Sequence, residues 1–131
     1  MAVWGFTERM LAGETLDVFG QGELARDFTY IDDIVEGILR VFDLPDDPAS
    51  PARIFNIGRG EPVTVNRLIE LLEARLGVPA SRRGLQRNPS EAVTTHASID
   101  RLMASTGYRP TVALEEGLDR FVSWYQSYRG V

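Results

Sequence analysis

The chain has 131 residues, of which 44% are hydrophobic and 25% are charged, a composition typical of one globular domain. Its formal net charge of -5 argues against nucleic acid as a partner, because neutralising phosphates requires a basic face. The absence of cysteine excludes disulfides, thiolate metal sites and a cysteine nucleophile.

The chain opens with one predicted helix followed by two short strands. Residues 1–12 have the pattern of a helix that stops at Gly13. This opening has no positively charged segment before a long apolar run, so we expect neither a signal peptide nor a membrane span. Residues 16–19 and 28–31 are strand candidates, separated by turn glycines.

The second predicted helix begins at Asp33, which forms a variant capping box with Glu36 and opens a helix to about residue 42. Its apolar residues repeat at the spacing of one helical face, which predicts that this face is buried. They are Ile34, Val35, Ile38, Leu39 and Phe42. Prolines and small polar residues at 44–51 then predict an exposed loop.

The middle of the chain carries a strand signal that requires partners. Residues 53–57 form an almost continuous apolar run, which is typical of a strand buried on both faces of a parallel sheet. After a turn at 58–62, Thr64 is predicted to cap a helix that ends at Gly77.

The last third is predicted to be a polar loop at 81–90, a weak strand at 92–97, and helices at 99–105 and 114–128. Roughly five helices then accompany three or four short strands, too few strands for an independent doubly wound sheet. We therefore predict an α/β fold class, mostly helical, with residues 1–131 forming a single domain that is a piece of a larger α/β body.

Arg26 is the candidate for an anion-binding residue, because it lies between a predicted strand and a predicted helix. It could equally form a surface pair with Asp27 or Asp32. The only histidine, His96, is predicted to be a packed side chain, and Asp32 and Asp33 are interpreted as capping residues rather than metal ligands. These residues alone predict no catalytic constellation.

Three sequence features argue against a complete cofactor-dependent active site. Gly20, Gly22 and Ala25 match the spacing of a dinucleotide-binding loop, but the segment behind them reads as extended, so we interpret them as a turn. Gly58 and Gly60 are likewise interpreted as a tight crossover turn. The chain has no lysine, which excludes a Schiff-base lysine, a P-loop lysine and a Tyr-x-x-x-Lys pair.

Four ordered segments resemble the NAD-dependent epimerase/dehydratases, which are extended short-chain dehydrogenases acting on nucleotide sugars. They are LDVFG at 16–20, RDFTYIDDI at 26–34, FNIG at 55–58 and EEGL at 115–118. The resemblance covers essentially the whole chain and is greatest to the UDP-glucuronate 4-epimerases. It implies a substrate-binding lobe from the C-terminal part of such an enzyme, with the N-terminal Rossmann domain, NAD and the catalytic Tyr-x-x-x-Lys absent from this chain.

The resemblance also implies substrate-binding roles. The family's Arg/Gln-x-Gly-Asp segment falls on residues 88–91, where Ser90 replaces glycine and glutamate replaces aspartate. The implied ligands are Leu16 and Phe19 around uracil, Arg26 on the diphosphate, Val63 beside the base and ribose, Asn88 on the diphosphate, Glu91 on the ribose, and Thr95 beside the sugar. No catalytic, cofactor-binding or metal-binding residue is implied within the chain.

The expected function is therefore UDP-sugar binding by a cytoplasmic chain that is inactive alone. Two alternatives remain open from the sequence. The altered segment at 88–91 favours a truncated remnant or a self-associating interaction module that no longer binds sugar nucleotide. The missing catalytic half instead favours one chain of a split epimerase whose partner carries the Rossmann domain.

Overall fold

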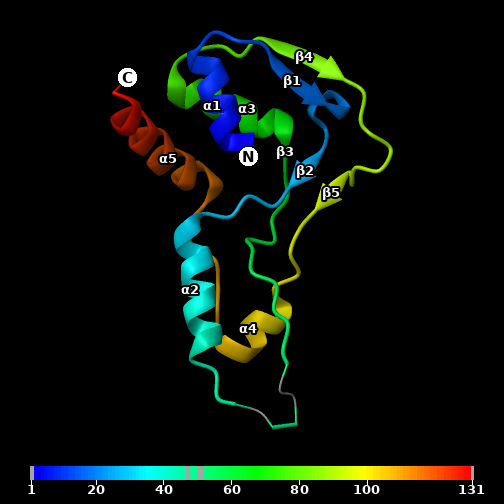
Figure 1. Cartoon of the computed structure of the whole chain (residues 1–131), viewed down its shortest axis with the longest axis vertical. Helices are drawn as coiled ribbons and strands as arrows, with labels where there is room; N and C mark the ends of the chain where they lie inside the picture. The colour runs from blue at the N-terminus through cyan, green and yellow to red at the C-terminus, as the bar shows by residue number, and fades with distance from the viewer. Residues whose placement is uncertain (1, 47, 50–51, 131) are drawn as a thin grey trace.

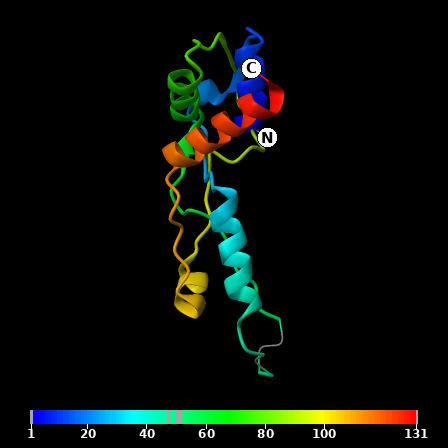
Figure 2. The same cartoon turned by 90° about the vertical axis from the view of Figure 1, so that its left-hand side faces the viewer.

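The computed structural model describes residues 2–46, 48–49 and 52–130. Figures 1 and 2 show an elongated molecule, with a wide body that holds both ends of the chain and a narrower arm below it. The helices are α1 (Ala2–Leu11), α3 (Val65–Leu76) and α5 (Leu114–Arg129) in the body, and α2 (Ile31–Phe42) and α4 (Asp100–Thr106) in the arm. The predicted α/β class, mostly helical with short strands, is confirmed.

Short strands form two small sheets. In the first sheet, β1 (Leu16–Phe19) and β4 (Arg82–Leu85) run parallel. In the second, β2 (Ala25–Arg26) lies between antiparallel β3 (Val63–Thr64) and parallel β5 (Thr94–Thr95). The second sheet therefore brings three distant parts of the chain to one place.

The body is held together by apolar side chains from α1, β1, α3 and α5. Its fully buried members include Leu16, Leu68 and Leu72. Thr64 caps α3 as predicted, since its Oγ1 accepts a hydrogen bond from the backbone N–H of Arg67 at 3.2 Å. The helix ends at Gly77 in the left-handed conformation, which also confirms the prediction.

In the arm, α2 packs closely on the extended segment 52–57. A Cβ placed on Gly37 would lie 2.8 Å from Cγ2 of Ile57, so glycine permits this close approach. Beside it, the buried side chains of Ile99, Leu102 and Tyr108 form a second small core. Burial also raises the pKa of the Tyr108 hydroxyl.

The predicted start of α2 was wrong. The helix begins at Ile31, with Tyr30 as its extended N-cap, so residues 28–31 form no strand. Asp33 therefore lies in the first turn of the helix and does not cap it. Its buried carboxylate instead accepts hydrogen bonds from the backbone N–H of Thr111 at 2.9 Å and of Val112 at 3.1 Å.

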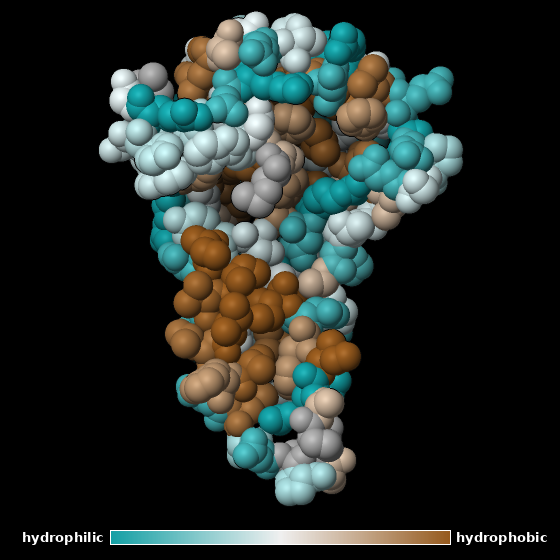
Figure 3. Space-filling view, in the orientation of Figure 1, coloured by the Kyte–Doolittle hydropathy of each residue, from teal (hydrophilic) through white to brown (hydrophobic). Residues whose placement is uncertain are grey.

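The predicted burial of one apolar face of α2 was also wrong. Val35, Ile38 and Leu39 are exposed, and Phe42 is 85% exposed. These side chains form much of the apolar patch on the lower half of the molecule in Figure 3. The face is open because the described part of the chain contacts α2 through its other side, at Asp33 and Gly37.

Two further predictions were wrong because strands depend on pairing partners. Residues 53–57 are not assigned as a strand, because none of the strands in the described ranges pairs with them, and Ile54 is 79% exposed. Conversely, the segment 81–90 was predicted to be a loop but contains β4, which forms by pairing with β1. The weak strand predicted at 92–97 is confirmed only at Thr94–Thr95.

Replacing Asp33 with alanine should lower the free energy of unfolding by about 3 kcal/mol, because buried backbone N–H donors lose a charged acceptor. Urea denaturation followed by circular dichroism measures this. The matched control is Asp32→Ala, whose exposed side chain pairs with Arg120 at 3.0 Å and should contribute less than about 1 kcal/mol. Equal losses in both variants would contradict this assignment of Asp33.

Candidate functional site

Strand β2 places Arg26 between two of the predicted substrate-binding residues. In the ladder, Arg26 is opposite Val63 of β3 on one side and opposite Thr95 of β5 on the other. The antiparallel and parallel pairings fix all three backbones. Residues far apart in sequence therefore lie next to Arg26 in one small sheet.

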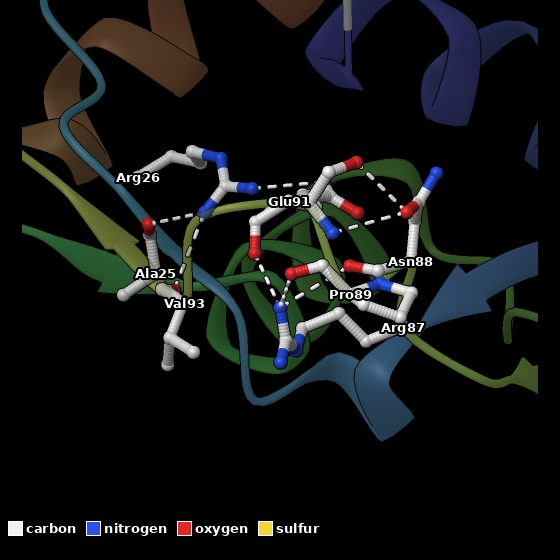
Figure 4. Close-up of polar contacts among 8 residues, drawn as sticks. Ala25, Arg26, Arg87, Asn88, Pro89, Glu91 and Val93 are labelled. Atoms are coloured by element: carbon white, nitrogen blue, oxygen red, sulfur yellow. Dashed lines mark hydrogen bonds and ion pairs between the residues drawn. The ribbon is translucent and has the colours of Figure 1, made fainter.

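The guanidinium of Arg26 is held by the protein on both terminal nitrogens. Its Nη1 donates to the carbonyl of Ala25 at 2.8 Å and to that of Val93 at 3.3 Å. Its Nη2 forms an ion pair with Oε1 of Glu91 at 2.8 Å (Figure 4). The predicted alternative pairing of Arg26 with Asp27 or Asp32 was therefore wrong.

The loop before β5 has a defined internal structure. The guanidinium of Arg87 donates to the carbonyls of Asn88 and Pro89, each at 3.2 Å, and to that of Glu91 (Figure 4). The Asn88 side chain accepts from the hydroxyl of Ser90 at 2.8 Å. Asn88 thus stabilises its own loop, while Glu91 reaches Arg26.

Strand β1 presents one of its two predicted base-binding side chains. Phe19 ends the strand and is exposed, whereas the side chain of Leu16 is fully buried in the core and is not available to a base. Next to them, a hydrogen bond from Arg83 of β4 lowers the pKa of the Asp17 carboxyl below its ordinary value.

The turn after Phe19 lies close to Arg87. A Cβ on Gly20 would lie 3.6 Å from Cβ of Arg87. The turn continues through Gly22 into β2, so the exposed ring of Phe19 and the guanidinium of Arg26 belong to one short stretch of chain.

Asp27 fixes the floor of a polar pocket next to Arg26. Its carboxylate accepts hydrogen bonds from the backbone N–H groups of Arg59, Gly60 and Ala97, at 3.2, 2.9 and 3.1 Å. A Cβ on Gly58 would lie 2.7 Å from this carboxylate, so only glycine fits. The chain bends at Gly58 and Gly60, where a crossover turn was predicted, and the Asp27 carboxylate holds this bend, although no strand precedes it.

The pocket itself has a volume of about 480 Å³ and is lined partly by polar side chains. These are Thr29, Asn56, Thr95 and His96. Of the four, only Thr95 was predicted to be a ligand, and the prediction that His96 is packed was wrong because it is exposed. The signal for Asn56 was its position as a lone amide inside the apolar run 53–57.

A second cavity of about 540 Å³ is lined by neighbouring residues of the same segment and is largely apolar. Arg26, Phe28 and Tyr30 line it together with Trp4 and Phe121 from the body helices. Arg26 therefore lines this apolar cavity, and the polar pocket begins at the next residue, Asp27.

The Gly20–Gly22 segment does not have the form of a dinucleotide-binding loop for NAD. The turn at Gly20–Gly22 is followed by strand β2 and not by a helix, so it offers no helix N-terminus to a pyrophosphate. No cluster of three or more His, Asp or Glu side chains that could hold a metal ion is found among the described residues. In the same part of the chain, every helix is too short or too polar to cross a membrane.

Comparison of the chain with known proteins identifies relatives of its sequence. A model of the NAD dependent epimerase/dehydratase family matches residues 2–58. Along 98% of its length the chain is 37% identical to a probable UDP-glucuronate 4-epimerase of Rhizobium meliloti, and along 99% it is 41% identical to UDP-glucuronate 4-epimerase 1 of Arabidopsis thaliana. It spans only 42% and 33% of those two proteins.

Solved structures of 4-epimerases also match the fold of the chain. UDP-glucose 4-epimerase of Thermotoga maritima, with UDP-glucose, matches 98% of the chain with a TM-score of 0.86 and 32% identity. UDP-glucuronic acid 4-epimerase of Bacillus cereus, in complex with UDP-glucuronic acid and NAD, matches with a TM-score of 0.87 and 30% identity. The chain has the fold of the C-terminal part of such epimerases. It covers 40% of each of these two structures.

Proposed function

We propose that this chain is the nucleotide-sugar-binding C-terminal portion of a UDP-glucuronate 4-epimerase-like enzyme, and that Arg26 is its diphosphate ligand. The observation that carries the proposal is the position of Arg26 on β2, where its backbone pairs with Val63 and Thr95 and its guanidinium is held at a fixed place. Arginine suits a diphosphate because its planar fork stays charged and donates two parallel hydrogen bonds. The relatives that bind UDP-sugars match nearly the whole chain, which supports the same ligand class.

The surroundings of Arg26 support an orientation for the ligand. The exposed ring of Phe19 offers a flat apolar surface on which a uracil can stack. The polar pocket offers hydroxyl and amide groups from Thr95, Thr29 and Asn56 for sugar hydroxyls. A UDP-sugar would then extend from Phe19, past Arg26, into the polar pocket. The cytoplasmic location predicted from the sequence stays a prediction.

Replacing Arg26 with alanine should weaken UDP binding by about tenfold to a hundredfold, the cost of losing hydrogen bonds to a charged group. Isothermal titration calorimetry with UDP and with UDP-glucuronate measures this. The matched control is Arg9→Ala, which removes an exposed arginine from α1 that lies 4.0 Å from Glu14. Similar weak heats for the wild-type chain and Arg26→Ala would contradict the assignment of Arg26.

The chain alone should not catalyse epimerisation. Mixed with NAD and UDP-glucuronate, it should give no 4-epimer, because it lacks a dinucleotide-binding loop and a catalytic Tyr-x-x-x-Lys pair. Chromatography of the sugar nucleotides after prolonged incubation measures this. A bacterial UDP-glucuronate 4-epimerase is the positive control, and any turnover by this chain above a protein-free blank would refute the prediction.

A second candidate function follows from the exposed apolar face of α2. Ile38, Leu39 and Phe42, together with Ile54 on the neighbouring segment, expose more apolar surface than single scattered residues. Residues 53–57 also offer backbone groups to which another strand could pair. These features support an interaction module that self-associates, or one chain of a split epimerase whose partner carries the Rossmann domain.

Self-association through this face should respond to a charge placed in it. Analytical ultracentrifugation should show the wild-type chain forming species heavier than the 14.6 kDa monomer as concentration rises, and Leu39→Lys should shift it to the monomer. Trp124→Lys is the control, since Trp124 is also exposed but lies on α5. A wild-type monomer at every concentration would rule out self-association. Epimerisation on addition of a separate Rossmann-domain chain would then support the split enzyme.

A further inference from the structure

The ion pair between Arg26 and Glu91 occupies the place where the proposed ligand would bind. Nη2 of Arg26 lies 2.8 Å from Oε1 of Glu91, while Nη1 is already bonded to the carbonyls of Ala25 and Val93. The Arg26 side chain is 27% exposed and that of Glu91 is 38% exposed. An entering anion therefore meets a guanidinium whose two terminal nitrogens both have protein acceptors.

Of these acceptors, only the carboxylate can leave without breaking the sheet. Ala25 belongs to β2, and its backbone N–H donates to the carbonyl of Val93 at 2.9 Å, so both backbones are held by strand pairing. Glu91 instead contributes a long side chain with rotatable bonds. When the Glu91 side chain moves away, one partly exposed ion pair is broken, and such a pair contributes little free energy.

The backbone of Glu91 is anchored independently of its side chain. Its N–H donates to the carbonyl of Asn88 at 2.9 Å, and its carbonyl accepts from Arg87. The Glu91 side chain can therefore rotate away from Arg26 while the loop keeps its shape. Arg87 positions Glu91 in this way without contacting the carboxylate.

Charge determines which ligands can take the place of Glu91. Among the described residues no ion pair is found for Arg87, so Arg26, Glu91 and Arg87 together carry a net positive charge. A singly charged anion that replaces the carboxylate gains little binding free energy, because one negative charge takes the place of another. A diphosphate brings more negative charge and several acceptor oxygens to the same donors.

We propose that Glu91 is an internal counter-ion that holds Arg26 in the ligand-free chain and makes it selective for a diphosphate, which displaces it. This inference rests on the proposed function of Arg26. It gives Glu91 a different role from the ribose contact implied by resemblance. As a counter-ion Glu91 opposes ligand binding, whereas as a ribose ligand it would support it.

Glu91→Gln and Glu91→Ala separate the two roles. Both remove the competing charge, so both should tighten UDP binding by about twofold to fivefold, the range for a partly exposed ion pair. Uridine, which has no phosphate, should bind these variants as it binds the wild-type chain. Glu36→Gln is the control, because it removes an equal charge from a residue that pairs with Arg40 on α2 in the arm. Calorimetry measures all affinities, and circular dichroism checks folding.

The other outcomes overturn the proposal in distinguishable ways. Weaker binding of both UDP and uridine by the Glu91 variants would identify a ribose ligand. Unchanged UDP binding by the variants would show that the ion pair does not compete with the ligand. UDP binding by the variants but not by the wild-type chain would support the counter-ion while removing UDP binding as a function of the natural sequence. No UDP binding by any of these proteins would overturn both this proposal and the proposed function.

Discussion

The carboxylate of Asp27 is the interaction on which the arrangement of the candidate site depends. It binds backbone N–H groups at residues 59, 60 and 97, so one side chain joins the segment after β2, the turn before β3 and the segment after β5. Because Arg26 ends β2 directly before Asp27, the same short stretch provides a structural anion and a partly exposed cation. The Asp27 carboxylate accepts hydrogen bonds from these backbone groups, while the Arg26 guanidinium forms an ion pair with Glu91.

The two parts of the molecule differ in how completely this chain buries them. In the body, helices α1, α3 and α5 enclose a core that includes Leu16 and Leu68. In the arm, α2 uses glycine and a buried carboxylate to contact its neighbours and leaves its apolar face open. An amphipathic helix with an exposed apolar face is stabilised when another surface covers it. The apolar face of α2 lies in the arm, whereas Arg26 lies on β2 in the body above it (Figure 1). Residues 55–57 line the polar pocket and also belong to the segment proposed to pair with a partner.

Local sequence signals were sufficient for the helices of the body. Thr64 and Gly77 marked the ends of α3 correctly, because a cap acts through hydrogen bonds within a few residues. The same reasoning failed at Asp33, which has the chemistry of a cap but whose buried carboxylate binds residues 111 and 112 instead. It failed again at residues 53–57, where an apolar run indicated a buried strand but no neighbouring strand of the described chain covers it. At Asp33 the deciding partners are distant in sequence, and at 53–57 the described chain provides no partner strand.

By itself the sequence determined the fold class, the absence of a lysine-dependent catalytic pair and the position of Arg26 as a cation ahead of a helix. Only the tertiary structure decided that Arg26 lies between Val63 and Thr95 and that Glu91 is its partner. The physical reason is the range of the interactions. Helix propensity and capping act over a few residues, whereas strand pairing and ion pairs join groups that are tens of residues apart. A candidate site built from such pairs becomes visible only when the chain is folded.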